Sequence, residues 1–550
     1  MWLNIYPDKA LYRPGETVPL VVEVIAQTET DVHLVAAIAF LSDEVARLTQ
    51  TIHLLAGETT TVELAWTPPV TAPRGYGVDL RVLDDAGQVL ATASTAFDVL
   101  ERWSQAPRYG FLTDFDPGRA DFDQTMLWLT RYHVNGLQFY DWMYRHQQLL
   151  PPTEVFDDAL GRRLSLTTVA KLIEAAHARG IAVMPYTAIY AAAVPFFYQN
   201  PNWALLDEDG HPIPFGDDFL MIMNPAADSL WTGHLQDQFA QVLERTAFDG
   251  IHLDQYGEPK VAHDADGNRL ELAAVIPEFI NLTKETAGKV RPDATVVFNC
   301  VNDWPIETVA RTRQDFVYIE VWPPHTLYRD LHTLIVKAQA LSGGKPVVLA
   351  VYIDPAHARN VRLANAVIFA SGGYHIELGE PGGMLADPYF PKYGDMGDKL
   401  ALVLQRYYDF GVRYENVLAL DTHDATPAYA GKVSVEGINT DAGRAYNKIW
   451  PIVRENDDTI ALSLINLLGL ESPEWNSLLL ADPPCQEDLV LRFYTECSPG
   501  RVWWATPDDD NLAVRELEFS IEQDKGEIYV TFCIPRLSWW DLIVLDKRVL

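Results

Sequence analysis

Positive charge, cysteine and long apolar runs are all scarce in this chain of 550 residues. It has 42 Lys and Arg against 76 Asp and Glu, so its formal net charge is -34. Nucleic acids and anionic membrane surfaces would repel such a chain, and we expect neither as a partner. No apolar run in the sequence is long enough to span a bilayer. A neutral substrate is therefore the expected class of ligand.

The four cysteines, Cys300, Cys485, Cys497 and Cys533, have neither the spacing of a zinc site nor the density of a disulfide scaffold. We interpret them as ordinary thiols, with a bridge between Cys485 and Cys497 as the alternative in a secreted form. The first eight residues lack a basic start followed by an apolar core, so the sequence as written predicts a cytoplasmic protein. Secretion is the alternative if the N-terminus is a processed form. No pattern predicts the oligomeric state.

Short strands with polar turns occur at both ends of the chain. In the first hundred residues, alternating patterns predict strands at residues 18–26, 32–40, 50–55, 60–66 and 76–83. Their spacing indicates an immunoglobulin-like β-sandwich over residues 1–98. After a helix at 399–410, further strand patterns lie at residues 459–467, 488–494, 516–521 and 527–532. They predict a second β-sandwich over residues 421–550.

From residue 109 the pattern changes to strand, loop and amphipathic helix. The candidate strands are residues 109–115, 136–142, 181–188, 250–256, 295–301, 316–322, 346–353 and 367–378. Helical patterns lie between several of them, at residues 166–179, 230–246, 276–290 and 327–342. Eight strands alternating with helices predict a central (β/α)8 TIM barrel, which we place at residues 99–420. An open doubly wound sheet is the alternative, but no Gly-rich phosphate turn follows the first strand.

Two carboxylates stand near the ends of the fourth and sixth candidate strands. Asp254 shares one face of its strand with His252, and Glu320 shares a face with Tyr318 and Trp322. Polar groups near the carboxyl ends of barrel strands gather at the barrel mouth, where reactions occur. A single carboxylate at such a position usually forms a cap or an ion pair. Two carboxylates on corresponding faces of their strands indicate that they act together as a pair. Glycosidic bond cleavage requires such a pair, so we predict a glycosidase.

Three segments of the barrel, residues 139–146, 249–254 and 318–322, resemble the signature segments of glycoside hydrolase family 66. That family contains endo-dextranases and cycloisomaltooligosaccharide glucanotransferases, and its domain order is similar to the one predicted here. The resemblance implies a retaining double displacement on α-1,6-linked glucan, with Asp254 as nucleophile and Glu320 as general acid and base. It also implies that Asp141, in the Tyr-Asp-Trp segment, is needed in the sugar pocket at the point of cleavage.

Further residues near the strand ends are candidates for binding the substrate. With Asp141, the candidates are Tyr140, His146, Tyr186, Gln255, Asn299, Asn302, Trp322, Tyr352 and Glu377. The aromatic residues could stack on sugar faces, with core packing as the alternative. The two asparagines could bind hydroxyl groups or form turns. Glu377 could bind sugar or form a structural pair with His375.

We expect no metal and no cofactor. Residues 264–268 resemble the start of a calcium loop, but position 12 of that loop is Val275 and not the bidentate glutamate. In the resembled family, the cyclising enzymes carry a long carbohydrate-binding insertion after the seventh strand, and residues 353–367 leave no room for one. Hydrolysis of an α-glucan or an oligosaccharide is therefore favoured over cyclisation. A catalytically silent carbohydrate-binding protein is the alternative from another functional class.

Overall fold

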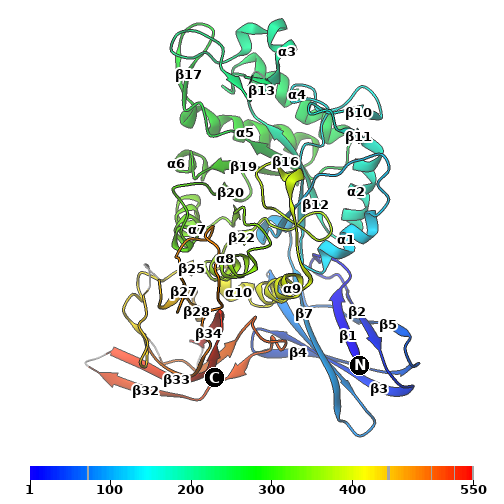
Figure 1. The fold of residues 1–550 in the computed structure, drawn as a ribbon, viewed down its shortest axis with the longest axis vertical. Helices are drawn as coiled ribbons and strands as arrows, with labels where there is room; N and C mark the ends of the chain where they lie inside the picture. Colours follow the sequence, from blue (N-terminus) through cyan, green and yellow to red (C-terminus); the bar gives the residue numbers. More distant parts are fainter. Residues whose placement is uncertain (71–72, 218, 442–445, 497, 525–526, 548–550) are drawn as a thin grey trace.

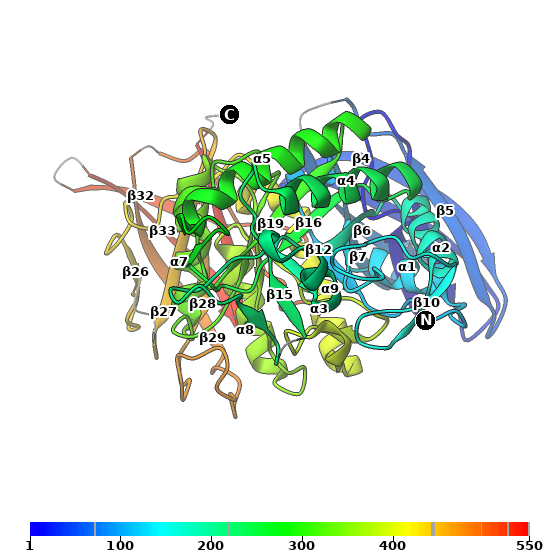
Figure 2. The same ribbon diagram turned by 90° about the horizontal axis from the view of Figure 1, so that it is seen from above.

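The computed structural model describes residues 1–70, 73–217, 219–441, 446–496, 498–524 and 527–547. Two antiparallel β-regions, blue at the N-terminus and orange to red near the C-terminus, lie at one end of a parallel barrel (Figure 1). Seen from above, they occupy opposite sides of the molecule (Figure 2). No helix in the described ranges has both the length and the apolar character that a membrane crossing requires. Cys497, and with it the alternative bridge to Cys485, lies outside the described residues.

The N-terminal region is a sandwich of two antiparallel sheets. One sheet has the order β1 (Trp2–Pro7), β2 (Val18–Ile25), β5 (Thr59–Trp66). The other has the order β4 (Asp43–Leu54), β3 (Thr30–Phe40), β6 (Arg74–Leu83), β7 (Val89–Val99). Alternate residues of β2 and β3 are buried between the sheets, which explains the period-two pattern of their sequences. The sequence pattern missed β1 and β7, and β7 contains Ala91, Ala93 and Ala96, which are weak strand signals.

The middle of the chain folds into the expected (β/α)8 barrel. Its parallel strands, in sheet order, are β8 (Tyr109–Leu112), β9 (Gly136–Phe139), β12 (Ala182–Ala188), β16 (Gly250–Asp254), β19 (Thr295–Val301), β20 (Val317–Glu320), β21 (Val347–Ala350) and β22 (Tyr374–His375). The two ends of this sheet meet where the Phe111 N–H donates to the Leu378 carbonyl at 3.1 Å. The surrounding helices are α1 (Phe122–Thr130), α2 (Leu166–Ala178), α4 (Leu230–Arg245), α5 (Leu272–Val290), α6 (Ile306–Val309), α7 (Tyr328–Ser342), α8 (Ala358–Ala370) and α9 (Asp398–Arg413).

The eighth strand is much shorter than the strand predicted at residues 367–378. Residues 367–370 belong to α8, and only Tyr374–His375 pairs with β21. Almost every side chain in the second half of α8 is buried. A fully buried helix gives a continuous apolar run that periodicity does not distinguish from a strand. Several other strands end two or three residues earlier than expected, so the residues that follow them form loops at the barrel mouth.

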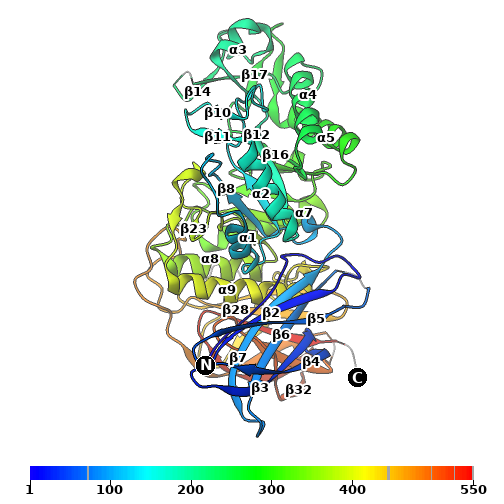
Figure 3. The ribbon, with the colours of Figure 1, turned by 90° about the vertical axis from the view of Figure 1, so that its right-hand side faces the viewer.

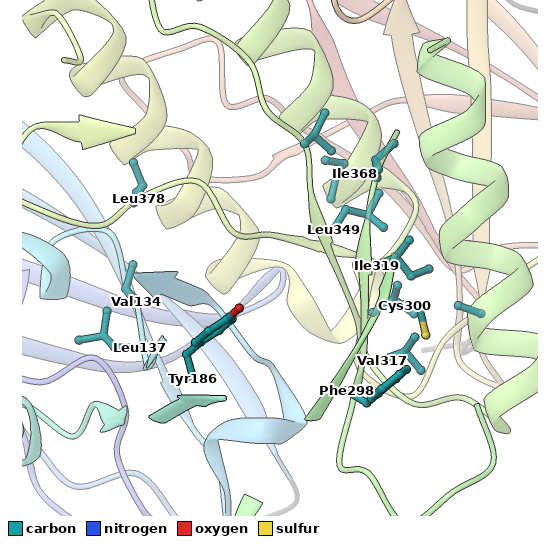
Figure 4. Packing of buried hydrophobic residues seen from close by; sticks show 14 of the residues in the cluster. Val134, Leu137, Tyr186, Phe298, Cys300, Val317, Ile319, Leu349, Ile368 and Leu378 are labelled. Carbon is teal, nitrogen blue, oxygen red and sulfur yellow. The ribbon is translucent and has the colours of Figure 1, made fainter. Parts of the chain in front are cut away.

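Alternation along the strands divides the barrel into two packed layers. Ile319 and Leu349 belong to the layer between the strands and the helices (Figure 4). The opposite strand faces point into the barrel, where the Tyr109 hydroxyl lies 3.1 Å from Nδ1 of His252. Tyr318 packs edge-on against the same imidazole. Residues of the parity of His252 and Tyr318 are therefore interior, as the sequence predicts.

Two excursions extend the carboxyl ends of the strands and were not expected from the sequence. Between β12 and α4 the chain forms β13 (Ala191–Ala193), α3 (Val194–Gln199), β14 (Pro214–Phe215) and β15 (Leu220–Ile222). After β16 it forms the hairpin of β17 (Val261–His263) and β18 (Arg269–Glu271). Both excursions lie at the end of the molecule opposite the two β-sandwiches (Figures 1 and 3). They add walls to the barrel mouth.

The C-terminal region is a second sandwich. One sheet has the order β25 (His423–Asp424), β27 (Ile449–Glu455), β28 (Thr459–Asn466), β34 (Trp540–Asp546), β30 (Arg501–Ala505), β31 (Arg515–Glu516). The other has the order β26 (Val433–Val435), β29 (Gln486–Thr495), β33 (Glu527–Leu537), β32 (Phe519–Asp524). Trp450, Trp503 and Trp540 are buried in the same hydrophobic core as the barrel helices, so this sandwich packs firmly on the barrel. The remaining short elements are β10 (Val155–Asp157), β11 (Arg163–Ser165), β23 (Gly383–Met384), β24 (Gly394–Asp395), α10 (Glu415–Leu418) and the 3-10 helices at Trp103–Gln105, Pro201–Trp203 and Phe390–Lys392.

Candidate active site

Asp254 and Glu320 end two strands that are separated by a single strand. Asp254 is the last residue of β16, Glu320 is the last residue of β20, and β19 pairs with both strands. Both residues are half-buried, and both line a cavity of about 880 Å³. The cavity opens at the carboxyl ends of the strands, where barrel enzymes carry out their reactions. The fold therefore brings together the two carboxyls that the sequence singled out.

One amide connects the two carboxyls by hydrogen bonds. Asn299, in β19, donates from Nδ2 to Oδ1 of Asp254 at 2.7 Å and to Oε2 of Glu320 at 2.9 Å. The Tyr186 hydroxyl donates to Oδ2 of Asp254 at 2.6 Å, and the Tyr352 hydroxyl donates to Oε1 of Glu320 at 2.7 Å. Because one nitrogen bonds both inner oxygens, these oxygens are separated by no more than the sum of the two bonds, about 5.6 Å.

Burial raises the pKa of both carboxyls above the ordinary values for Asp and Glu. The charge on Glu320 raises the pKa of Asp254 further, while the hydrogen bonds from Tyr186 and Asn299 lower it. Asn299 and Tyr352 lower the pKa of Glu320 in the same way. Since two carboxylates at this distance repel each other, the pair keeps one proton to a higher pH than isolated carboxyls would. Such a pair can supply an acid and a nucleophile or base together.

Asp141 and His146 line the same cavity from the loop that follows β9. Asp141 has a left-handed backbone, with φ of 52°, and Arg162 donates to its carbonyl oxygen at 2.8 Å. Burial raises the pKa of the Asp141 carboxyl to about 7, although the Arg162 charge acts to lower it. Burial lowers the pKa of His146 to about 4, so its imidazole is neutral near pH 7. The loop thus offers a carboxyl and a neutral ring to a ligand.

Tyr140, Tyr186 and Trp322 contribute aromatic surface to the cavity. The Tyr140 ring stacks on Phe390 with 4.4 Å between centroids and lies 4.8 Å from Tyr186. Trp322 lies 5.6 Å from the ring of Tyr352. These rings pack against other aromatics and also reach the cavity, where a sugar face could stack on them.

The sequence offered Glu377 as a candidate for binding the substrate, but its side chain does not line the cavity. Its side chain is fully buried, and Oε1 accepts from Nδ2 of Asn365 at 2.8 Å and from the Tyr408 hydroxyl at 3.0 Å. Nδ1 of His375 lies 3.3 Å from Oε2. The structural pair that the sequence allowed as the alternative is the arrangement present, since the residues after β22 turn toward α8 and α9.

Gln255 and Asn302 line the cavity but use their amides within the protein. Oε1 of Gln255 accepts from the Gly257 N–H at 2.5 Å, and Nε2 donates to the Asn299 carbonyl at 3.2 Å. Asn302 has a left-handed backbone, and its Nδ2 donates to the Pro323 carbonyl at 2.9 Å. Asn302 therefore serves as a turn residue. Gln255 braces the strand that carries Asn299.

Several cavity residues were missed by the sequence analysis, all of them on loops or excursions. They are Leu160, Phe215, Phe219, Tyr256, Lys260, Trp304, Tyr389 and Lys392. The rings of Phe215 and Tyr256 stack at 3.9 Å with 10° between their planes. Tyr256 could have been found, because it follows Asp254 by two residues and shares its parity. No comparable signal marks Phe215, which the excursion after β12 brings to the cavity.

The segment that resembles a calcium loop is the turn between β17 and β18. Oδ1 of Asp264 accepts from the N–H groups of Asp266 and Asn268, at 2.9 and 2.8 Å, and so caps the turn. Among the residues that the structure describes, no group of three or more His, Cys, Asp or Glu side chains is placed to hold a metal ion.

Comparisons with known protein families and relatives add to these observations. The family model described as "Glycosyl hydrolase family 66" matches residues 7–544. The chain is 25% identical, over 707 aligned positions, to a cycloisomaltooligosaccharide glucanotransferase of Niallia circulans, with 99% of this chain and 72% of the relative covered. It is 22% identical, over 612 positions, to a dextranase of Streptococcus salivarius, with 96% of this chain and 72% of the relative covered.

A solved structure has the same fold. The cycloisomaltooligosaccharide glucanotransferase of Paenibacillus sp., in complex with cycloisomaltoheptaose, superimposes with a TM-score of 0.91 at 24% identity. The superposition covers 98% of this chain and 99% of the other. At that level of identity, the likeness establishes a common architecture for the barrel and its flanking β-regions.

Proposed function

The chain belongs to glycosyl hydrolase family 66, and from this premise we propose that it hydrolyses α-1,6-glucosidic linkages in dextran or isomaltooligosaccharides with retention of configuration. Asp254 is the nucleophile and Glu320 the general acid and base. The dextranase and the glucanotransferases among its relatives support the substrate class.

The spacing of the carboxyls is the observation that carries the proposal. Retaining glycosidases place their two carboxyls about 5–5.5 Å apart, whereas inverting enzymes leave about 6.5–9.5 Å, because a water must fit between carboxyl and sugar. The limit of about 5.6 Å between the inner oxygens of Asp254 and Glu320 favours the shorter arrangement. At the shorter spacing no water fits between Asp254 and the sugar, so the carboxylate itself is the group that would attack C1.

The proposed reaction has two steps. Protonated Glu320 gives its proton to the glycosidic oxygen as Asp254 attacks C1, so that the glycosyl ester forms while the bond to the leaving chain breaks. Water then attacks C1, Glu320 takes a proton from it, and Asp254 leaves as a carboxylate. Asp141 holds hydroxyl groups of the sugar on the non-reducing side of the cut, where its hydrogen bonds strengthen as the ring flattens.

The cavity suits a chain that runs through the site. Its lining comes from the loops after β9 and β22, with Asp141 and Tyr389, and also from those after β16 and β19, with Tyr256 and Trp304. These loops lie on different sides of the barrel mouth because β9 and β22 flank β8, whereas β16 and β19 are neighbours farther along the sheet. Contacts on both sides of the cut favour internal cleavage.

Cyclising transglycosylation is the second candidate, because two of the relatives are glucanotransferases. The alignment with one of them spans 707 positions although this chain has 550 residues, so the relative contains insertions that this chain lacks. Residues 351–357 alone connect β21 to α8, at the place where the family resemblance puts a carbohydrate-binding insertion in the cyclising enzymes. Both observations favour hydrolysis.

The test is to incubate the purified protein with α-1,6, α-1,4 and β-linked glucans and to measure new reducing ends. We expect release from dextran alone, with the α-anomer as the first product seen by NMR. A β-anomer formed first contradicts retention, and cyclic products without new reducing ends support the transferase. No release from any glucan supports a carbohydrate-binding protein without catalysis.

A further inference from the structure

Five residues from adjacent parts of the barrel form one unbroken chain of hydrogen bonds across its mouth. The chain runs from Tyr186 in β12 through Asp254, Asn299 and Glu320 to Tyr352, which follows β21. This is also the order of the neighbouring strands, β12-β16-β19-β20-β21. Asn299 lies at its centre and bonds to both carboxyls. The sequence suggested sugar binding for Asn299, but its amide nitrogen is committed to the carboxyls.

The two carboxyls also fix the orientation of the Asn299 amide. The side chain is 5% exposed, and its Oδ1 has no hydrogen-bond partner in the described part of the chain. Turning the amide over would place that oxygen against two carboxyl oxygens and would break both bonds. A neutral amide has two N–H groups on one nitrogen, so it can donate to two carboxylates without adding charge.

We propose that Asn299 is a positioning residue, which holds the carboxyls of Asp254 and Glu320 at their working separation and stabilises the anionic form of each. The assignment of catalytic roles to these carboxyls rests on the proposed function, whereas the bridge does not. A hydrogen bond to an ionised carboxylate is stronger than one to the neutral acid, so the bridge opposes the effect of burial on both groups.

Apart from Asp141, whose carboxyl lines the same cavity and has a pKa raised by burial to about 7, the titratable groups that face the pair are six tyrosines and one histidine. Tyr140, Tyr186, Tyr190, Tyr256, Tyr318 and Tyr352 all have a pKa raised by burial and remain neutral over the working range. Burial lowers the pKa of His252 to about 3, so it is neutral as well. In the described residues, no Lys or Arg charge contributes to the pKa of either carboxyl. Asp141 titrates in the same range as the pair, so the movement of each limb between variant and wild type, in both of which Asp141 is unchanged, reports on the pair.

The three donors have different expected effects on the pH profile of kcat/KM. With the proposed roles, the low-pH limb reports ionisation of Asp254 and the high-pH limb reports loss of the Glu320 proton. Tyr186→Phe removes a donor from Asp254 only and should move the low-pH limb upward. Tyr352→Phe should move only the high-pH limb upward. Asn299→Ala removes a donor from both carboxyls, so both limbs should move upward by about one pH unit.

The experiment measures kcat, KM and the pH profile of Asn299→Ala on an isomaltooligosaccharide. We expect kcat to fall about 10²-fold because the carboxyls lose their fixed separation, with KM within about twofold since Asn299 does not line the cavity. Asn365→Ala is the matched control, because Asn365 is also buried and donates to the Glu377 carboxylate outside the cavity. It should lower the melting temperature and leave both limbs unchanged.

An Asn299→Ala profile with neither limb moved, or with only one moved, overturns the proposal. If that variant does not fold, the isosteric Asn299→Asp replaces it, and the same upward movement of both limbs is expected. Difference infrared titration of the carboxyls gives a readout that needs no substrate. This titration keeps the two proposals separate. Inactivity of the wild type on every glucan refutes the proposed function. An unchanged titration of the carboxyls in the variant refutes the bridge.

Discussion

The floor and the rim of the cleft are built in opposite ways. We define the floor as Tyr186, Asp254, Asn299, Glu320 and Tyr352, and the rim as Leu160, Phe215 and Phe219. The floor residues come from strands or strand ends and bond to one another, so their positions are set by the barrel. The rim residues come from loops and from the two-residue strand β14, and their apolar side chains are 38–49% exposed. The difference suggests that the floor performs the chemistry and the rim binds sugar faces.

The two regions also differ in their expected effect on stability. Burial of the Asp254 and Glu320 carboxyls is unfavourable when they are ionised, and their mutual repulsion adds to this. The rim exposes apolar surface but buries no charge. A change in the floor should therefore trade stability against activity, whereas a change in the rim should affect binding with little effect on stability.

The largest effect is expected for Asp254→Asn. Under the proposed mechanism no glycosyl ester can form without this carboxylate, so kcat should fall by ~10⁴-fold or more. Because the folded-state pKa of Asp254 is raised, this carboxyl binds its proton more tightly in the folded protein than in the unfolded chain. Its contribution to stability is therefore lost as pH rises through the raised pKa, and the ionised group destabilises the fold.

Thermal unfolding of Asp254→Asn at neutral pH measures this consequence. The melting temperature should equal or exceed that of the wild type. A large fall in the melting temperature would mean that Asp254 supports the fold instead of the chemistry, and the contrast between floor and rim would then fail. Phe219→Ala is a suitable reference, since its side chain is 38% exposed and carries no charge.

The next largest effect is expected for Glu320→Gln, which removes the proposed general acid and base. We expect kcat on dextran to fall by about 10²–10⁴-fold and the high-pH limb of the profile to disappear. Aryl glucosides with good leaving groups need little protonation and should be less affected. Azide should restore turnover of Glu320→Ala with retained configuration, and inverted product would assign Glu320 as the nucleophile instead.

The sequence predicts the floor better than the rim for a physical reason. Side chains along a strand alternate with a fixed period of two. The side of the strand to which Asp254 and Glu320 point could therefore be inferred without a structure. The bridge through Asn299 could not be inferred, because it depends on β19 lying between β16 and β20 at a matched height. The prediction of the eighth strand failed because the buried residues 367–370 of α8 have no polar face.

The rim residues lie on loops and short strands whose sequences have no periodic pattern. Phe215 reaches the cavity through an excursion whose strands have two or three residues each, too short for a pattern. Glu377 illustrates the opposite error, since its place at a strand end suggested sugar binding while Asn365 and Tyr408 hold it in the core. Whether a strand-end residue faces the cavity is decided by neighbouring helices, which the local sequence does not encode.

A smaller effect is expected for Asp141→Ala, at the boundary between floor and rim. If its hydrogen bond to a sugar hydroxyl is worth ~3 kcal/mol in the transition state, kcat should fall about 10²-fold. KM should change less, because the bond strengthens only as the ring flattens. Steady-state kinetics on isomaltooligosaccharides measure both constants. A raised KM with unchanged kcat would place Asp141 with the rim as a binding residue alone.

The smallest effect is expected for Phe215→Ala. One face of the ring is covered by Tyr256 at 3.9 Å, and 39% of the side chain remains exposed beside the cavity. Stacking on a sugar is worth ~1 kcal/mol and is the same in the ground state and the transition state, so KM for long isomaltooligosaccharides should rise about fivefold while kcat stays constant. Phe215→Tyr keeps the ring and should restore KM, and a disaccharide too short to reach the rim should not respond. If kcat falls equally on long and short substrates, the rim takes part in the chemistry and its separation from the floor is refuted.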